Sequence, residues 1–335
     1  MSGDREAYID DSPGETRGII EGEQGFEHIL IEREADDPAL RLGAVSVGRV
    51  TRVEPGLSGA FLDLGAAEGF LPLKRDAGVH VGQKVEVEVV AEPREAKGAT
   101  LKMLGLAEGE ARLIRPGPGV AEWLERLAPG LSPITGKAAI EAGWAAIEEA
   151  ETPAMPGGGP DVAVERTRAM ITVDIDQSAV SGKCLNARDR QRANQEGLRI
   201  AARLIGLRRW GGLVAVDLLG AGHDGAKITA AARTAFGADP TIAYGPVNRF
   251  GVLQLVLPWR FTPLEELIHT GMEAIACEAA RKLNHGLLID TASARITVRC
   301  HGDVAKAAAP LVARLGPRAH VLADDSLPLT RVMIE

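Results

Sequence analysis

The sequence predicts an α/β protein with several domains, and three features of the chain support this prediction. Two apolar runs, 170–173 and 213–216, are typical of buried strands, and the amphipathic stretch 186–207 between them predicts a helix. Five short strand-like runs within 44–104, separated by Gly and Pro, predict a small closed β-barrel. Near the C-terminus, apolar runs flank an alanine-rich helical segment near 305–315, which predicts a small α/β unit.

Acidic residues follow both of the first two predicted strands. Asp174 and Asp176 come after the first strand, and Asp217 comes after the second. A helical crossover makes such strands parallel and usually neighbouring, so their carboxyl ends lie side by side. Crowded carboxylates repel one another unless a cation or protons neutralise them, and an all-oxygen set suits Mg²⁺ or Mn²⁺ better than zinc. The pattern favours metal-dependent phosphate chemistry. The alternative is that Asp176 and Asp217 are solvated strand-end carboxylates.

The composition is that of a soluble globular protein. The chain has 335 residues, of which 45 % are hydrophobic, enough for several cores. No apolar run approaches the roughly 20 residues of a membrane span, and the acidic start, MSGDREAYIDDSPGE, is unlike a signal peptide. We therefore expect a cytoplasmic protein. Cys184, Cys277 and Cys300 are widely separated, which predicts buried thiols rather than disulfides or a structural zinc site.

Positive charge is unevenly distributed along a chain whose net charge is -8. Such a net charge argues against nucleic acid as a partner, because affinity for it comes mainly from cations on phosphates. However, Arg188, Arg192, Arg199 and Arg203 recur at spacings of four, seven and four, which places them on one stripe of the predicted helix. The stripe is either a binding surface for phosphates or an ordinary solvated helix face.

Two aromatic residues mark the predicted barrel. Phe61 and Phe70 stand out in a chain with only 4 % aromatic residues. Aromatic rings on which bases stack, flanked by cations, are typical of barrels that bind single strands. The alternative is that the two rings belong to the apolar interior of the barrel. The cations near them in sequence are Arg49, Arg52, Lys74, Lys97 and Lys102.

A glycine pattern follows the second strand. Gly220, Gly222 and Gly225 form G-x-G-x-x-G before a predicted helix, as in dinucleotide-binding folds. In those folds the acidic partner lies at the carboxyl end of the next strand. Asp239, about twenty residues on, precedes Pro240 and so begins a strand. The pattern is therefore weak support for a dinucleotide site.

Several motifs in order resemble one family of nucleases. The segment GRVTRVEPGLSGAFLDLGAAEGFLPLK resembles the S1 domain of the ribonuclease E/G family of endoribonucleases. Downstream, PGGG at 156–159, ITVDIDQSAVSG, ANQEGLRIAARLIGLRRWGGLVAVDLLG and NRFGVLQL resemble the catalytic segment of that family in order and spacing. The resemblance extends over most of the chain.

The resemblance implies roles for particular residues. Asp174 and Asp217 match the two aspartates that hold the catalytic Mg²⁺, and Asp176 stands where the family usually has asparagine. An additional carboxylate can still ligate the ion. Asn194 and Glu196 match an N-x-E motif. Arg249, Phe250 and Gly251 match an R-F-G motif. The residues expected to contact RNA are Phe61, Phe70 and Lys97 of the S1 domain, together with Arg188, Arg192 and Arg249.

The resemblance also implies a domain plan. A T-P-L-E sequence at 262–265 predicts a capping box that opens a helix running to about residue 284, before Gly286. The small C-terminal domain is a possible homodimer interface. The expected domains are an RNase H-like α/β subdomain at 1–43 and 106–168, an inserted S1 (OB-fold) barrel at 44–105, a catalytic α/β subdomain at 169–262 and the small C-terminal α/β domain at 263–335.

The chain departs from the family in two places. Only about sixty residues separate the barrel from ITVDID, less than half the family's usual length, and the missing part corresponds to the 5′-sensor. The paired cysteines of the zinc-link are replaced by LPWRFTPLEELI. We therefore expect a Mg²⁺-dependent endoribonuclease that hydrolyses single-stranded RNA in RNA processing or decay, without reference to the RNA's 5′ end. The alternative is a non-catalytic, S1-containing RNA-binding paralogue.

Overall fold

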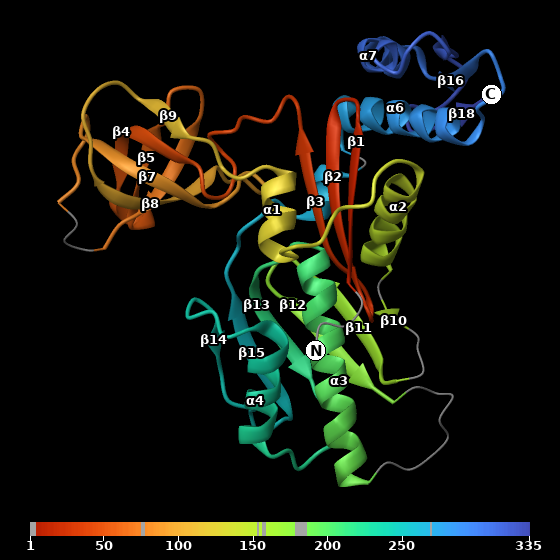
Figure 1. Cartoon of the computed structure of the whole chain (residues 1–335). Coiled ribbons are helices and arrows are strands. Elements are labelled where there is room, and N and C mark those ends of the chain that lie inside the picture. Colours follow the sequence, from red (N-terminus) through yellow and green to blue (C-terminus); the bar gives the residue numbers. More distant parts are fainter. Residues whose placement is uncertain (1–4, 75–77, 153, 156–158, 178–185, 269) are drawn as a thin grey trace. The chain divides into compact units, whose positions relative to one another are not determined.

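The computed structural model describes residues 5–74, 78–152, 154–155, 159–177, 186–268 and 270–335 (Figure 1). Its contacts divide the chain into two compact units. Unit 1 comprises 1–21, 28–145 and 260–335, and unit 2 comprises 22–27 and 146–259. Cys184, residues 156–158 of PGGG and residues 178–182 after ITVDID lie outside the described residues.

Unit 1 contains the closed barrel that the sequence predicts. The strands pair in the order β5-β6-β8-β7-β4, and a further pairing between β4 and β5 closes the barrel. Leu62, Leu71 and Val87 are among the buried residues that fill the interior. An additional strand, β9 (Arg112–Arg115), pairs with β4 and was not expected from the sequence. The five barrel strands are β4 (Val45–Glu54), β5 (Gly59–Asp63), β6 (Glu68–Pro72), β7 (Lys84–Ala91) and β8 (Ala99–Leu106).

The barrel is inserted between two segments that pack against each other. The first forms a three-stranded sheet of β1 (Glu6–Ser12), β2 (Glu15–Gly22) and β3 (Gly25–Arg33). The second carries α1 (Val120–Leu127) and α2 (Lys137–Glu151). Ile20 and Leu30 of the sheet share one buried cluster with Val120 and Leu124 of α1. Burial of these four side chains joins the two segments across the inserted barrel.

The C-terminal part of unit 1 is the predicted small α/β unit. Strands β16 and β17 are parallel and are connected by α7, while β18 pairs with β16 in the antiparallel sense. Cys277 and Cys300 are buried free thiols, as expected. The elements are α6 (Gly271–Ile289), β16 (Ile296–Cys300), α7 (Gly302–Ala313), β17 (Ala319–Ala323) and β18 (Val332–Ile334).

The prediction of one capped helix over 262–284 is wrong. Thr262 does not cap a helix, because its N–H donates to Glu92 Oε2 at 3.0 Å and its hydroxyl donates to the carbonyl of Pro93 at 2.7 Å. The short helix α5 (Leu264–Leu267) ends where Ile268 adopts an extended conformation, and α6 starts anew. Gly286 lies inside α6, where a Cβ would come within 3.2 Å of the side chain of Ile334 and that side chain would have to shift slightly.

Unit 2 is built on a six-stranded sheet with the order β10-β11-β12-β13-β15-β14. Only β12 and β13 are parallel, and α3 (Ala187–Leu207) connects them, which confirms the predicted β-α-β unit. The Asn186 side chain caps α3 by accepting from two backbone N–H groups. The strands are β10 (Ala154–Met155), β11 (Asp161–Arg166), β12 (Ile171–Asp176), β13 (Gly212–Asp217), β14 (Ala243–Tyr244) and β15 (Val252–Leu257).

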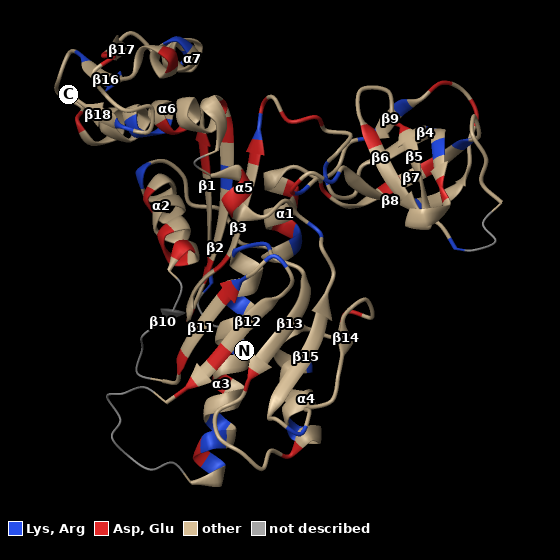
Figure 2. Cartoon of the chain, turned by 180° about the vertical axis from the view of Figure 1, so that it is seen from behind, with Lys and Arg blue, Asp and Glu red and all other residues tan. Residues whose placement is uncertain are grey.

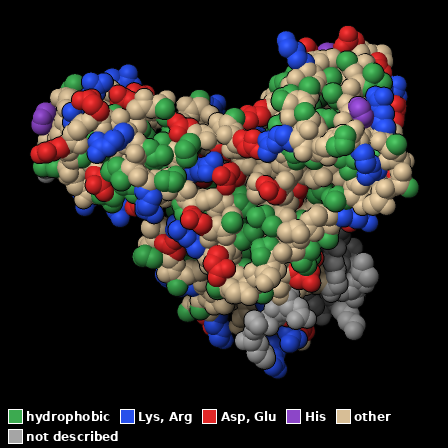
Figure 3. Space-filling view, turned by 45° about the horizontal axis from the view of Figure 1, so that its top comes forward, with side chains coloured by type: hydrophobic (Ala, Val, Ile, Leu, Met, Phe, Trp, Pro, Cys, Tyr) green, Lys and Arg blue, Asp and Glu red, His purple; other side chains and the backbone are tan. Residues whose placement is uncertain are grey.

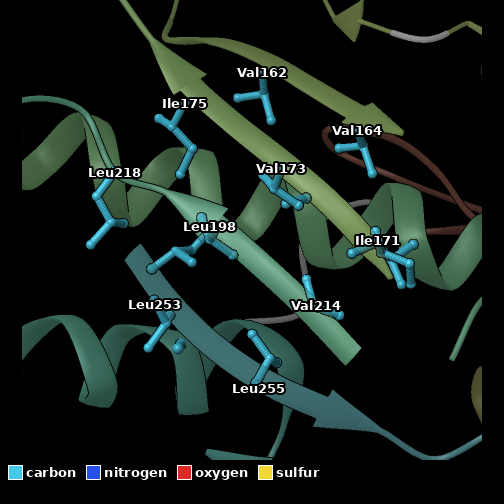
Figure 4. Close-up of a cluster of buried hydrophobic side chains, with 14 of the residues drawn as sticks. Val162, Val164, Ile171, Val173, Ile175, Leu198, Val214, Leu218, Leu253 and Leu255 are labelled. Carbon is cyan, nitrogen blue, oxygen red and sulfur yellow. The ribbon is translucent and has the colours of Figure 1, made fainter. Parts of the chain in front are cut away.

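Both helices of unit 2 cover the same face of this sheet. Helix α3 and α4 (Gly225–Phe236) lie together in front of the strands in Figure 1. Figure 4 shows the resulting core, in which Leu198 of α3 lies near Val173 and Ile175 of β12. No helix of unit 2 is found on the opposite face among the described residues, and this open face carries the polar side chains of the strands.

The parallel order of a dinucleotide-binding fold is not present after the glycine pattern. The two strands that follow α4 are β14 and β15; β15 runs antiparallel to β13, and β14 pairs with β15 in the antiparallel sense. Dinucleotide folds need a parallel strand at this point. Among the described residues, no helix has the length and apolar character needed to cross a bilayer.

Candidate active site and nucleic-acid interface

The register of the parallel strands brings two of the predicted carboxylates together. Side chains of β12 alternate, so Ile171, Val173 and Ile175 pack under the helices while Asp174 and Asp176 point to the open face. Asp174 lies directly opposite Asp217 of β13. Neighbouring strands are about 4.8 Å apart, so these two carboxylates can share one ligand. Figure 2, which views the sheet from behind, shows acidic residues in red on β11, β12 and β13.

A fourth carboxylate, Asp161, joins this group. It begins β11 and lies directly opposite Asp176 in the antiparallel β11–β12 pair. The sequence prediction missed it, because it stands at the start of a strand rather than after a predicted strand, and its position depends on the register. The alternating sequence DVAVER was the available signal, since it marks a half-buried strand beside ITVDID.

Among the described residues, no cation compensates the negative charge of this group. Partial burial raises the pKa of Asp174, and the charges of Asp217, Asp176 and Asp161 raise it further. Within the described parts of the chain, none of these four carboxylates forms an ion pair with Lys or Arg. We call Asp161, Asp174, Asp176 and Asp217 the carboxylate edge.

The carboxylate edge fits a magnesium ion that also binds substrate, rather than an ion fully enclosed by protein. No group of three or more His, Cys, Asp or Glu side chains in the described residues is arranged to hold a metal. The registers instead give two facing pairs, Asp174 with Asp217 and Asp161 with Asp176. Mg²⁺ is usually held by one or two carboxylates, with water and substrate phosphates completing its shell. The donor set is all oxygen and has no paired cation among the described residues, which matches that mode.

Asn194 positions the chain that follows Asp217. Its side chain is 1 % exposed and makes two hydrogen bonds with Leu219, donating to the carbonyl at 3.2 Å and accepting from the N–H at 2.8 Å. This clamp fixes the backbone two residues beyond the carboxylate. Glu196 has a different environment, because it pairs with Arg199 at 2.7 Å and accepts from Gln24 at 3.1 Å.

A tight turn at 248–251 ends next to Asp217. The Asn248 side chain accepts from the N–H groups of Phe250 and Val252, and Val252 is directly opposite Asp217 in the sheet. The Arg249 guanidinium stands over the Phe250 ring, 4.6 Å from its centroid. Phe250 itself is 73 % exposed. An aromatic ring and a cation are therefore presented beside the carboxylate edge.

His223 lies in the loop after β13 and is engaged locally. Its Nε2 lies 3.0 Å from the carbonyl of Gly220, and a carbonyl only accepts, so this nitrogen carries a proton. The ring also borders Gly251. These contacts fasten the loop to the turn at 248–251 and leave Nε2 unsuited to act as a base.

The predicted arginine stripe is divided in the structure. Arg188 and Arg192 are exposed, and in the described residues no carboxylate pairs with either. Arg203, by contrast, turns inward to pair with Glu149 and donates to the carbonyl of Phe26 at 2.8 Å. Fifteen residues separate Arg188 from Arg203, and at 3.6 residues per turn this rotates the later side chain by about 60°. The prediction of one four-residue stripe is therefore wrong at its C-terminal end.

Phe61 and Phe70 lie on the outside of the barrel. They are opposite each other in the β5–β6 pair, and their rings meet edge to face with centroids 5.3 Å apart. Both are half-exposed, whereas the adjacent residues Leu62 and Leu71 are buried. The guanidinium of Arg52 stands 4.3 Å from the centre of the Phe61 ring. The alternative that the two rings fill the core is thereby excluded.

Lys97 is exposed in the turn before β8. Its ammonium lies 3.7 Å from Glu95, and Thr100, three residues further on, pairs with Phe70. The other cations of the barrel are mixed with acidic residues, as the blue and red side chains over it in Figure 3 show. The barrel surface is therefore not uniformly basic, and its aromatic pair is its most distinctive feature.

No model of a known protein family matches the chain. A search of curated proteins likewise finds no match for its sequence.

Proposed function

We propose that this protein is a magnesium-dependent endoribonuclease that hydrolyses single-stranded RNA. The observation that carries the proposal is the facing pair of Asp174 and Asp217 on the open face of the sheet, where no cation of the described residues pairs with either carboxylate. The aromatic pair on the barrel supports a single-stranded substrate. The resemblance of the motifs to the ribonuclease E/G family supports the same reaction, with an RNase H-like subdomain around the barrel.

The residues of the carboxylate edge have separable tasks in this proposal. Asp174 and Asp217 would hold Mg²⁺, which when bound supplies a more acidic water and charge stabilisation at phosphorus. Asp176 and Asp161 add to the negative field that attracts the cation. Asn194 keeps the backbone after Asp217 in one conformation, so that the carboxylate is oriented before the substrate arrives.

Binding of the strand is assigned to separate surfaces. The rings of Phe61 and Phe70 offer stacking faces for bases, and Lys97 and the Arg52 guanidinium contribute positive charge beside them. On α3, Arg188 and Arg192 are available for phosphates. Figure 2 shows this basic part of α3 in blue. Contacts of this kind recognise the phosphate backbone of the RNA and its unpaired bases rather than a particular base sequence.

The second candidate function is RNA binding without cleavage. Two observations favour it: the aromatic pair of the barrel needs no metal to stack bases, and Asp176 occupies a position where the family usually has asparagine. In that case the carboxylate edge would have no part in a reaction.

A cleavage assay with carboxylate variants distinguishes the two functions. An unstructured A/U-rich RNA, prepared with either a 5′-monophosphate or a 5′-hydroxyl, is incubated with the protein and Mg²⁺. We expect cleavage of both forms at similar rates. Asp174→Asn and Asp217→Asn should each lose roughly a thousandfold in rate, since the ion supplies several kcal/mol of charge stabilisation.

The matched control is Glu165→Gln, which removes an exposed carboxylate at the other end of β11, opposite Thr172. It should cleave like the wild type. Binding without cleavage by the wild type would establish the second function. Undiminished cleavage by Asp174→Asn would show that the active site lies elsewhere.

A further inference from the structure

Phe250 is the most unusual apolar residue of unit 2. All six phenylalanines of the chain lie in the described residues, and the other five are half-buried. Phe250 is 73 % exposed and contributes to no buried cluster. Exposure of so large an apolar ring does not stabilise the fold, because the ring keeps almost all of its contact with water. Its position therefore needs another explanation.

The turn that carries Phe250 is held in one conformation. Asn248 binds the N–H groups of Phe250 and Val252 at 2.9 and 3.1 Å, and the N–H of Gly251 donates to the Asn248 carbonyl at 3.1 Å. Gly251 has a φ of +86°, a conformation that favours glycine. The hydrogen bonds of Asn248 and the conformation of Gly251 therefore define the turn, and this turn fixes the position of the Phe250 ring.

The ring stands beside the carboxylate edge. Val252 is opposite Asp217, and Phe250 precedes Val252 by two residues. The spacing of strands and the reach of two residues place the Cα atoms of Phe250 and Asp217 within about 12 Å of each other. A nucleotide whose phosphate lies at Asp217 can therefore place its own base, or that of its neighbour, against the ring.

The surroundings of the ring suit a nucleobase. The Arg249 guanidinium covers one face of Phe250 at 4.6 Å, which leaves the other face for stacking. The same guanidinium is a cation for the adjoining phosphate. A base that stacks here must be unpaired, because bases within a duplex are already stacked on their neighbours.

We propose that Phe250 is the stacking residue for the base next to the cleaved phosphate, and that it makes the site select unpaired nucleotides. The inference rests on the proposed function in one respect, namely that phosphate binds at Asp217. Stacking on Phe250 orients the nucleotide relative to the carboxylates and tolerates any base, since every base has a π-face. Phe250 is thus a positioning residue for the RNA strand at the active site, in addition to the aromatic pair of the barrel.

The first test is a series of substitutions at residue 250 in the full chain. Phe250→Ala should raise KM for an A/U-rich RNA by about tenfold, the effect typical of one lost stacking contact. Phe250→Leu, which keeps an apolar side chain but no ring face, should resemble Phe250→Ala. Phe250→Trp should keep KM close to that of the wild type. The matched control is Ile289→Ala, which removes an exposed apolar side chain of α6 and should change nothing.

Photocrosslinking provides a readout that does not need cleavage. RNAs with 5-iodouridine at successive positions are irradiated on the protein, and the crosslinked peptides are identified by mass spectrometry. We expect a crosslink to Phe250 from a position next to the cleavage site, and its loss in Phe250→Ala. A Phe250 crosslink with a protein that does not cleave would support the stacking site while refuting the nuclease function.

The opposite result separates the two proposals in the other direction. If the wild type cleaves, yet Phe250→Ala has an unchanged KM and no position crosslinks to Phe250, the stacking proposal is overturned and the nuclease function stands. Equal KM values for Phe250→Leu and the wild type would also overturn it, because apolar bulk rather than a ring face would then suffice. Equal melting temperatures of the variants exclude misfolding as the cause of any change.

Discussion

Unit 1 and unit 2 each contain a cluster of carboxylates, and among the described residues only the cluster of unit 1 is paired with arginines. In unit 1, Arg281 is completely buried and donates to Asp10 at 2.5 Å and to Glu278 at 3.3 Å. Glu15 pairs with Arg17 at 2.8 Å and with Arg33 at 2.7 Å. In unit 2, the carboxylate edge has no cation among the described residues. Charges that the fold compensates hold the fold together, whereas uncompensated charges on an open face are available to an external cation.

For this reason the pKa of Glu15 in unit 1 and the pKa of Asp174 in unit 2 shift in opposite directions. Burial alone would raise the pKa of Glu15, but the charges of Arg17, Arg281 and Arg33 hold it below its ordinary value. At the carboxylate edge, burial and like charges both act to raise the pKa of Asp174. Glu15 is therefore stable as an anion inside the fold, while Asp174 becomes more stable as an anion only when a cation arrives.

The largest expected effect is the loss of the buried arginine. Arg281→Met would leave Asp10 buried without the cation that pairs with it and would remove one of the three arginines around Glu15, at a cost of about 3–5 kcal/mol in the free energy of unfolding of unit 1. Hydrogen exchange of the α6 and β1 amides, measured with chemical denaturation, reports on this unit.

The control for that substitution is an exposed pair in the same unit. Arg314 lies 2.7 Å from Glu34, and both side chains are about half exposed. Arg314→Gln should cost less than about 1 kcal/mol. A similar loss of stability in both variants would show that the buried ion pairs of Arg281 contribute no more than the exposed Arg314–Glu34 pair. The comparison between the two units would then fail.

Magnesium should stabilise unit 2 and leave unit 1 unaffected. At ten times its dissociation constant the ion contributes about 1.4 kcal/mol, or roughly 4–6 °C in the melting temperature of a unit this size. Asp217→Asn should show no such shift, and without metal it should be at least as stable as the wild type because a repulsion is removed. Calorimetry at constant ionic strength, with KCl replacing MgCl₂, measures the difference. An equal magnesium shift in Asp217→Asn would place the ion away from the carboxylate edge.

Acid should weaken unit 1 through Glu15. A carboxylate with a lowered pKa in the folded state stabilises the fold above its unfolded pKa, about 4.3 for Glu, and this contribution is lost as the pH falls through the folded value. We therefore expect the stability of unit 1 to be constant down to about pH 5 and to decline below it. Glu15→Gln should be less stable at pH 7 and decline less steeply. Hydrogen exchange of the β2 amides measures this loss of stability. An equally steep loss in the wild type and in Glu15→Gln would exclude Glu15 as its cause.

The regular elements of the chain were largely predictable from the sequence. The strands of the barrel and β13 lie within one or two residues of the runs that predicted them. Strand β12 extends three residues beyond its predicted end at Val173, so Asp174 and Asp176 lie within the strand rather than after it. The β-α-β unit follows from the length of its crossover, and with it the pairing of Asp174 with Asp217. These features depend on local patterns, which the chain carries in short windows.

Other features depended on contacts between distant segments. Asp161 joins the carboxylate edge only because β11 pairs with β12 in one register. Arg203 leaves the basic stripe because Glu149 lies within reach of it. Thr262 fails as a helix cap because Glu92 and Pro93 take its hydrogen bonds. In each case a contact with a residue remote in sequence determines the position or the partner of the side chain, which the local pattern does not reveal.

The amino-acid pattern by itself determined most of the strands, the barrel, the crossover helix and the three acidic residues at the ends of the two strands that this helix connects. Only the tertiary structure decided which face of the sheet stays open and which arginines of α3 pair with carboxylates. It also decided that the rings of Phe61, Phe70 and Phe250 are at least partly exposed to solvent. The physical reason is that periodicity specifies which side of an element is apolar, whereas register and packing specify what that side meets.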